Sequence, residues 1–245
     1  AAAAGTITVL PFTARAGGPS TNEFKTDAGL ITVHPISHAS MVLETPAGAI
    51  YVDPVGDAAT YDGMPPADLV LVTHEHGDHY VPEAIAAIKG DAAMITNPAV
   101  ADMLPDDLKP NASNIANGDI TTWNGIEIEA IAAYNTSENK QNFHPQGRDN
   151  GYVLNFEGFR IYISGDTEQT PEMSALENID LAFVCMNLPF TMSAEAAAEA
   201  VKAFAPTYVY PYHFRGRDLS GTQDPVVFAD LVGDASEVKI ANWYG

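Results

Sequence analysis

Three histidines and one aspartate fall within six consecutive positions of the chain, directly after a short apolar segment. They are His74, His76, Asp78 and His79, and residues 68–72 precede them. Neutral imidazole nitrogen and carboxylate oxygen are ligands that zinc and similar divalent metals take in proteins. Packing alone gives no reason to crowd imidazoles, because they repel one another when protonated. The spacing therefore predicts a metal site.

The elements that must position this site are short buried strands. After Asp68, residues 69–72 are apolar and rich in branched side chains, and the segment ends abruptly, which is typical of a buried β-strand. Ligand sites in α/β folds lie at the carboxyl ends of such strands. Asp166 and His213 also follow apolar segments with strand character. We therefore expect both side chains to point into the cleft that holds the first cluster.

The spacing His-x-His-x-Asp-His resembles the metal-binding signature of the metallo-β-lactamase superfamily. Three further segments are similar to that family and occur in the same order: residues 50–54, 162–167 and 210–213. The resemblance runs from about Leu30 to His213 and so covers most of the chain. Several shorter segments look most like the branch that contains ascorbate-6-phosphate lactonase. These segments are residues 133–135, 143–145 and 151–153.

The resemblance implies an α/β fold, namely the four-layer αβ/βα sandwich of this superfamily. The segments form two similar halves with no linker or low-complexity stretch between them, so we expect residues 1–245 to be a single metallo-hydrolase domain. Hydrophobic patterning predicts strands near residues 6–10, 30–33, 41–44, 49–53, 126–132, 152–156, 159–164, 181–185 and 208–212. Helices are expected over residues 82–89 and from an N-cap at Ser193 to about Phe204.

The resemblance also implies how the ligands divide between two ions. Asp166 lies in a Gly-Asp-Thr context and would bridge the ions, because a carboxylate can give one oxygen to each. The remaining ligands would be His74 and His76 for the first ion, and Asp78, His79 and His213 for the second.

The first ion would still lack a third protein ligand. In much of the superfamily a histidine ends the strand that closes here with Asn135, and an amide is a poor zinc ligand. His144 lies further along the same connection and matches a histidine of the lactonase-like branch. We expect His144 to be the third ligand; the alternative is a histidine at the rim, beside the substrate.

Four other residues near these motifs differ in their expected roles. Asp53 ends a strand and should hydrogen-bond the metal loop and orient its histidines, with direct ligation as the alternative. His38 resembles a family position near the site and would either support the ligands or simply pack there. His34 is expected to be structural. Glu75 lies between two ligands and should point away from the metals, to brace the loop or face solvent.

The charge balance narrows the class of partner. The chain has 11 basic and 32 acidic residues, a net charge of −21, which disfavours a nucleic-acid partner because phosphates would be repelled. No apolar stretch approaches the roughly 20 residues that cross a membrane, so no membrane partner is expected. The remaining partner is a small-molecule substrate. The oligomeric state stays open.

Cysteine content and the first residues bear on the compartment. Cys185 is the only cysteine, so no intramolecular disulfide can form, and its apolar surroundings favour a buried side chain over a reactive thiol. Residues 1–5 are small, as near signal-peptidase cleavage sites, which is compatible with a mature exported protein. A trimmed chain would begin in the same way, so the compartment stays open.

Three arginines are notable because basic residues are scarce. Arg215 and Arg217 lie within four positions of His213, and Arg148 follows His144 closely. Guanidinium groups hold carboxylates and phosphates by paired hydrogen bonds, so these side chains are expected to bind an anionic part of the substrate. Ion pairing with the acidic surface is the alternative.

A two-metal cleft of this kind implies hydrolysis. A water between the ions would have its pKa lowered toward neutrality, and the resulting bridging hydroxide would attack a carbonyl carbon or phosphorus. Asp78 and Asp166 would be the catalytic residues, orienting the hydroxide and moving a proton to the leaving group. The expected substrate is a small ester, lactone or phosphoester. Zinc is the expected ion, although manganese and iron suit the same ligands.

Other activities of the same fold were considered. A mononuclear-iron oxidoreductase of the sulfur dioxygenase type needs ligands for one ion, whereas this chain carries ligands for two. A ribonuclease or phosphodiesterase of the superfamily would need an RNA-gripping region, which this acidic chain lacks. A β-lactamase is disfavoured by Asn135, and a scaffolding protein with a degenerate site is disfavoured by the intact ligand set.

Overall fold

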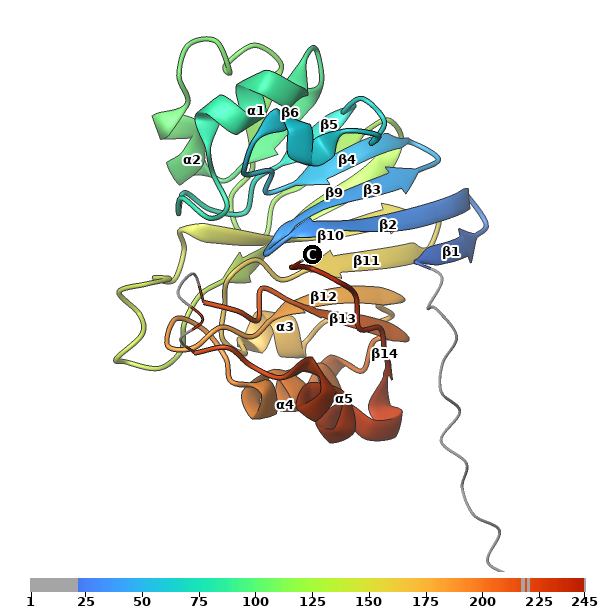
Figure 1. Ribbon diagram of the computed structural model, residues 1–245, viewed down its shortest axis with the longest axis vertical. Coiled ribbons are helices and arrows are strands. Elements are labelled where there is room, and N and C mark those ends of the chain that lie inside the picture. The colour runs from blue at the N-terminus through green and yellow to red at the C-terminus, as the bar shows by residue number, and fades with distance from the viewer. Residues whose placement is uncertain (1–21, 217–218, 220, 245) are drawn as a thin grey trace, which may run out of the picture.

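Two seven-stranded sheets form the centre of the protein (Figure 1). The structure is a computed structural model that describes residues 22–216, 219 and 221–244. Helices cover the outer face of each sheet: α1 (Pro82–Lys89) and α2 (Pro98–Met103) on the first, α3 (Pro171–Ser174), α4 (Ala194–Phe204) and α5 (Pro225–Val232) on the second. This order of layers confirms the predicted four-layer αβ/βα sandwich. The strand predicted near residues 6–10 lies outside the described residues.

The first sheet contains seven strands in chain order. They are β1 (Glu23–Thr26), β2 (Gly29–Ser37), β3 (Ser40–Thr45), β4 (Gly48–Val52), β5 (Leu69–Leu71), β6 (Ala93–Thr96) and β7 (Ala112–Asn114). Neighbours from β1 to β4 are antiparallel, and neighbours from β4 to β7 are parallel. The parallel strands all end at one edge, where their following loops meet.

The second sheet repeats this plan. Its strands are β8 (Ile120–Trp123), β9 (Ile126–Ala133), β10 (Asp149–Phe156), β11 (Phe159–Ile163), β12 (Leu181–Cys185), β13 (Tyr208–Tyr212) and β14 (Glu237–Val238). Three antiparallel pairings are again followed by three parallel ones. Each strand of the first half therefore has a counterpart in the second, as the two similar halves of the sequence predict. Two short 3₁₀ helices, Ala58–Tyr61 and Gly233–Ala235, complete the elements.

Strand β5 shows how the sequence positions the metal loop. Leu69 and Leu71 point into the core between the sheets, and Val70 and Val72 pack on the opposite face against the α1 side. All four side chains are fully buried. Apolar residues on both faces of a strand are expected where helices and a second sheet cover it. A one-residue slip would exchange the two faces, so the loop that follows β5 leaves the sheet at a fixed point.

Turn residues account for the predicted hairpin between β10 and β11. Glu157 and Gly158 have φ values of 52° and 102°, and they join two strands whose last and first residues are paired. Two-residue hairpins favour positive φ because such turns match the twist of the strands.

Two other expectations concern the burial of Cys185 and the presence of a membrane-spanning helix. Cys185 is fully buried at the end of β12, and burial raises the pKa of its thiol to about 12. Among the helices of the described residues, none is both long enough and apolar enough to span a membrane.

We expect Gly151→Ala to destabilise the fold. A Cβ at Gly151 would lie 2.7 Å from the carbonyl oxygen of Ile163 and 2.9 Å from that of Ser164, and backbone on an adjacent strand cannot move away easily. Overpacking of this kind costs about 1–3 kcal/mol. Urea unfolding measures the loss. Gly77→Ala is the matched control, because a Cβ there meets nothing within 4 Å; equal midpoints for the two variants would contradict the assignment.

Candidate metal centre

A buried aspartate anchors the loop that follows β5. Asp53 accepts hydrogen bonds from the backbone N–H of Thr73 (2.7 Å), from the Thr73 hydroxyl (2.6 Å) and from Nδ1 of His79 (2.7 Å). Its side chain is fully buried. A carboxylate bonded to Nδ1 fixes the ring of a histidine and directs its Nε2 away, a common arrangement behind metal ligands. Asp53 therefore sets the direction in which His79 points.

Three histidines meet in the first cluster. One ring nitrogen each of His74, His76 and His144 lies within 4.8 Å of the others, and Nε2 of His74 is 3.1 Å from Nδ1 of His76. The structure thus brings His144 to the position expected of a third ligand. Asn135 lies behind it, where its amide donates to the carbonyls of Lys140 and Phe190 and holds the loop.

His144 is oriented by Asp149, which was not predicted from the sequence, and Asp149 is held in turn by Arg148. Its Nδ1 lies 2.9 Å from Asp149, and Arg148 donates to both oxygens of that carboxylate at 2.6 and 3.0 Å. Arg148 also bonds the carbonyl of Phe143 and pairs with Glu75 at 2.9 Å. The guanidinium of Arg148 therefore joins the loop that carries His144 to the loop that carries Glu75.

A second cluster comprises His38, Asp78 and His213. Nε2 of His38 is 3.4 Å from Oδ2 of Asp78, and Nε2 of His213 is 3.5 Å from the same oxygen. The rings of His38 and His213 are tilted by 41° with centroids 3.8 Å apart. His213 follows β13 and Asp78 follows β5, whereas His38 comes from the turn between β2 and β3.

Asp166 lies between the two clusters. Its Oδ1 is 3.4 Å from Nε2 of His79, while its Oδ2 is 3.4 Å from Nε2 of His213 and 3.5 Å from Nε2 of His144. With His74 and His79 it forms a third group of potential ligands. Of the set expected for the second ion, Asp78 and His213 lie beside His38, and His79 lies beside Asp166. The rings of His79 and His213 are stacked with centroids 4.9 Å apart, so the three expected side chains lie near one another.

The contacts between carboxylates and histidines shift the pKa values of both kinds of group in the centre. Burial by itself raises the pKa of Asp78 and Asp166, yet the nearby histidines bring both values below the usual range, so both carboxyls are ionised. Burial lowers the pKa of His74, and the neighbouring His79 lowers it further. Burial also opposes a charge on His79, but Asp166 and Asp53 raise its pKa well above the usual value. The carboxylates therefore favour a positive charge at this point.

Several buried polar atoms fit a bound cation. Among the described residues, Nε2 of His79, Oδ1 of Asp166 and both ring nitrogens of His213 have no hydrogen-bond partner. An unpaired buried polar atom costs free energy, and such atoms are rare unless a water or an ion satisfies them. Imidazole nitrogens and carboxylate oxygens facing one another at 3.4–3.5 Å suit a divalent metal ion. The residues present fit the metal that the fold implies.

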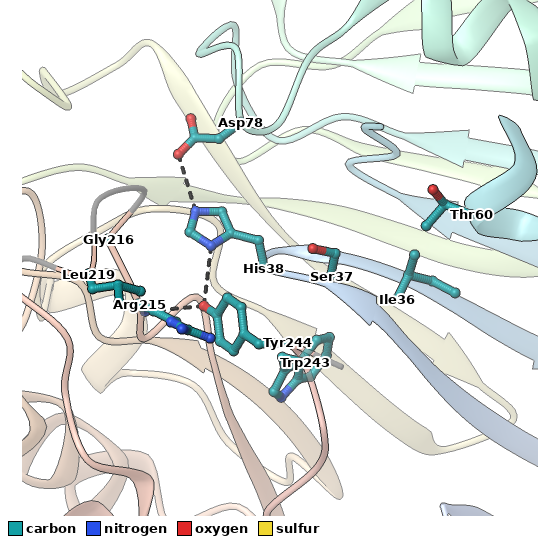
Figure 2. A pocket seen from close by; sticks show the side chains of 10 residues that line it. All are labelled: Ile36, Ser37, His38, Thr60, Asp78, Arg215, Gly216, Leu219, Trp243 and Tyr244. Atoms are coloured by element: carbon teal, nitrogen blue, oxygen red, sulfur yellow. Dashed lines mark hydrogen bonds and ion pairs between the residues drawn. The ribbon is translucent and has the colours of Figure 1, made fainter. Parts of the chain in front are cut away.

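A cavity of about 610 Å³ opens beside the second cluster. His38, Asp78, Arg215 and Tyr244 line it, together with apolar side chains that include Trp243 (Figure 2). The Arg215 guanidinium lies 5.2 Å from the centroid of the Tyr244 ring. Of the three arginines singled out from the sequence, Arg215 is in this wall, Arg148 is not, and Arg217 lies outside the described residues.

Three residues of the site were not predicted from the sequence: Thr73, Asp149 and Tyr244. Thr73 precedes His74, and Asp149 lies between Arg148 and the strand predicted near residues 152–156. Both residues are therefore close in the sequence to a predicted site residue. The Tyr244 hydroxyl lies 3.2 Å from Nδ1 of His38 across 206 positions of the chain. No local pattern predicts such a contact. His34, by contrast, pairs with Glu44 at 2.6 Å and belongs to none of the three ligand groups.

Two sheets in a four-layer sandwich with histidine and aspartate ligands at their strand ends define a metallo-β-lactamase fold. Residues 32–213 match the Beta-lactamase superfamily domain. A UPF0173 metal-dependent hydrolase of Thermococcus onnurineus is 33% identical over 71% of this chain and 78% of its own. One of Thermococcus kodakarensis is 30% identical over 86% and 96%. The chain belongs to this superfamily and, within it, to the UPF0173 family of metal-dependent hydrolases.

A solved structure agrees with this placement. A protein of Parabacteroides distasonis, described as a metal-dependent hydrolase, superposes with a TM-score of 0.78 at 40% identity. The match covers 89% of this chain and 96% of the other. The protein is therefore a metal-dependent hydrolase.

We expect Asp149→Asn to weaken metal binding at the cluster of His74, His76 and His144. The amide cannot accept from His144 as a carboxylate does, and loss of such a partner lowers metal affinity about 10–100-fold. Competition against a chelating dye, with zinc added to metal-depleted protein, measures the change. Asp102→Asn, at an exposed position of α2, is the matched control. Equal zinc affinity in the two variants would remove Asp149 from the site.

Proposed function

We propose that the chain hydrolyses a small ester or lactone that carries an anionic group, using two divalent ions, with zinc the expected metal. The observation that carries this proposal is the position of Asp78. The residue belongs to a ligand cluster and also lines the 610 Å³ cavity, so a substrate in the cavity would lie against the metal centre. A lactone is favoured over other esters by the sequence likeness to the lactonase-like branch.

The ions would supply a nucleophile from water at neutral pH and would draw charge from the reacting oxygen of the substrate. His74, His76 and His144 would hold one ion, and Asp78, His79 and His213 would hold the other, with Asp166 between them. These side chains are presented by loops whose positions Asp53 and Asp149 fix. The centre is thus preorganised before substrate arrives, as electrostatic catalysis requires.

The two aspartates would have different roles in moving the proton. Both are ionised at neutral pH and can only accept. The side chain of Asp166 is 5% exposed and is surrounded by histidines, whereas that of Asp78 is 39% exposed and faces the cavity. Asp78 is therefore the carboxylate that can take a proton from water and deliver it to a leaving group.

Arg215 would select the charge of the substrate. It is the described arginine in the cavity wall, and its guanidinium is placed over the ring of Tyr244, which limits its freedom. A charge-assisted pair with a carboxylate or phosphate would hold the anionic end while the ester or lactone bond lies at Asp78. The acidic composition of the chain also argues against a polyanionic substrate such as RNA.

Hydrolysis is tested with metal-depleted protein reloaded with zinc, manganese or iron. The panel contains a neutral lactone, a carboxylated lactone, a sugar-phosphate lactone, para-nitrophenyl acetate and bis(para-nitrophenyl) phosphate. We expect ester or lactone hydrolysis that requires added metal and is lost in Asp78→Asn. Hydrolysis of the phosphodiester alone would favour the phosphodiesterase alternative. Activity that survives chelation, or no hydrolysis in any metal form, would contradict the proposal.

We expect Arg215→Ala to raise KM for the carboxylated lactone about tenfold or more, since a hydrogen bond to a charged group contributes about 1.5–3 kcal/mol. KM for the neutral lactone should change little, because that substrate makes no such bond. Steady-state kinetics on both substrates provide the comparison. Lys109→Ala removes an exposed cation that pairs with Asp106, and serves as the control. A similar rise in KM for both lactones would show that Arg215 does not distinguish substrates by their charge.

A further inference from the structure

His38 and His144 occupy corresponding places in the two halves. His38 lies in the turn between β2 and β3, and His144 lies in the connection between β9 and β10, the counterparts of those strands in the second sheet. Each connection projects a histidine toward the centre from the antiparallel part of its own sheet. His144 meets the first cluster, and His38 meets the second.

The backbone around His38 is unusually constrained. His38 has a φ of 59° and His213 a φ of 48°, a region that residues with a side chain seldom adopt. The two are joined directly, because the N–H of His213 donates to the carbonyl of His38 at 3.2 Å. The N–H of His38 in turn donates to the carbonyl of Trp243 at 3.3 Å. Strain held by such bonds is typical of functional positions, and here the two imidazole rings lie with centroids 3.8 Å apart.

The nitrogens of His38 follow the arrangement found at the ligand histidines. In His79 and His144, Nδ1 faces a carboxylate and Nε2 faces the centre. In His74, Nδ1 lies 3.0 Å from the Thr73 hydroxyl. In His38, Nδ1 lies 3.2 Å from the Tyr244 hydroxyl, and Nε2 faces Asp78 at 3.4 Å.

We propose that His38 is a ligand of the second ion through Nε2, together with Asp78 and His213, and that the Tyr244 hydroxyl fixes the required tautomer by accepting from Nδ1. This inference rests on the proposed two-ion site. The Tyr244 oxygen also accepts from the backbone N–H of Arg215 at 3.1 Å, so it is itself held in place. Figure 2 shows the resulting chain from Arg215 through Tyr244 and His38 to Asp78.

The alternative arrangement has the opposite tautomer. If Nε2 of His38 carried the hydrogen, it would donate to Asp78 and could not bind an ion, and Tyr244 would donate to Nδ1. The two arrangements therefore differ in one observable property, namely whether Nε2 of His38 bears a hydrogen or a metal when the centre is loaded. Activity would not separate them, since losing His38 would harm the centre in either case.

The test uses NMR of the full chain with nitrogen-labelled histidine, loaded with a spin-active cadmium isotope. We expect a one-bond cadmium–nitrogen coupling at Nε2 of His38, with hydrogen retained on Nδ1. His34 is the internal control and should show no coupling, because it pairs with Glu44 outside the ligand groups. A hydrogen on Nε2 of His38 in cadmium-loaded protein would overturn the proposal.

The same spectrum separates failure of this inference from failure of the proposed function. Couplings at the other ligand histidines without one at His38 would reject the His38 ligand and leave a two-ion hydrolase standing. Those histidines are His74, His76, His79, His144 and His213. No coupling at any histidine would reject the metal centre itself. As a second measurement, Tyr244→Phe should lower the affinity of the second ion site for cadmium about 10-fold or more and leave the affinity of the first site unchanged. Unchanged affinity at both would remove Tyr244 from the arrangement.

Discussion

The buried carboxylate of Asp53 is the interaction on which the metal centre depends. It bonds the backbone and hydroxyl of Thr73 and Nδ1 of His79, so one side chain sets both the path of the loop and the direction of a ligand. Burying a carboxylate is costly unless its oxygens are satisfied, and these three donors satisfy them. The Asp149–His144 pair repeats the arrangement on the opposite side. Imidazoles held in this way cannot turn aside to relieve their crowding, and a cation becomes the natural partner for them.

The repeated architecture explains why the ligands meet although they are far apart in the chain. Both sheets run from antiparallel hairpins to parallel strands, and the loops at the carboxyl ends of the parallel strands face one another. His213 follows β13, and Asp166 follows β11, the counterpart of the strand that ends before Asp53. The hairpin connections add one histidine from each half. The two proposed ions would therefore have related, but not identical, surroundings.

Much of this arrangement could be predicted from the sequence, and the limits have physical causes. Strands β12 and β13 were predicted with their observed bounds, because continuous burial makes a short apolar segment distinctive. Strand β8 was not predicted, since Ile120 is exposed at the edge of its sheet. Among the site residues, the dense histidine cluster is a local signal, and so could be read directly. The pairing of Tyr244 with His38 depends on tertiary folding and has no local signal.

The charge of the molecule adds a constraint on substrate binding. With a net charge of −21, the chain repels anions at long range, but salt screens exposed charges beyond about 8 Å at physiological ionic strength. Arg215 lines the cavity and lies over the Tyr244 ring, and the Tyr244 hydroxyl bonds both the backbone N–H of Arg215 and the ring of His38. A single aromatic side chain thus connects the proposed anion-binding group to the proposed metal ligand. The contact from Arg215 to the Tyr244 oxygen is made by the backbone N–H, so loss of the guanidinium would remove the proposed anion-binding group and leave the support of His38 in place.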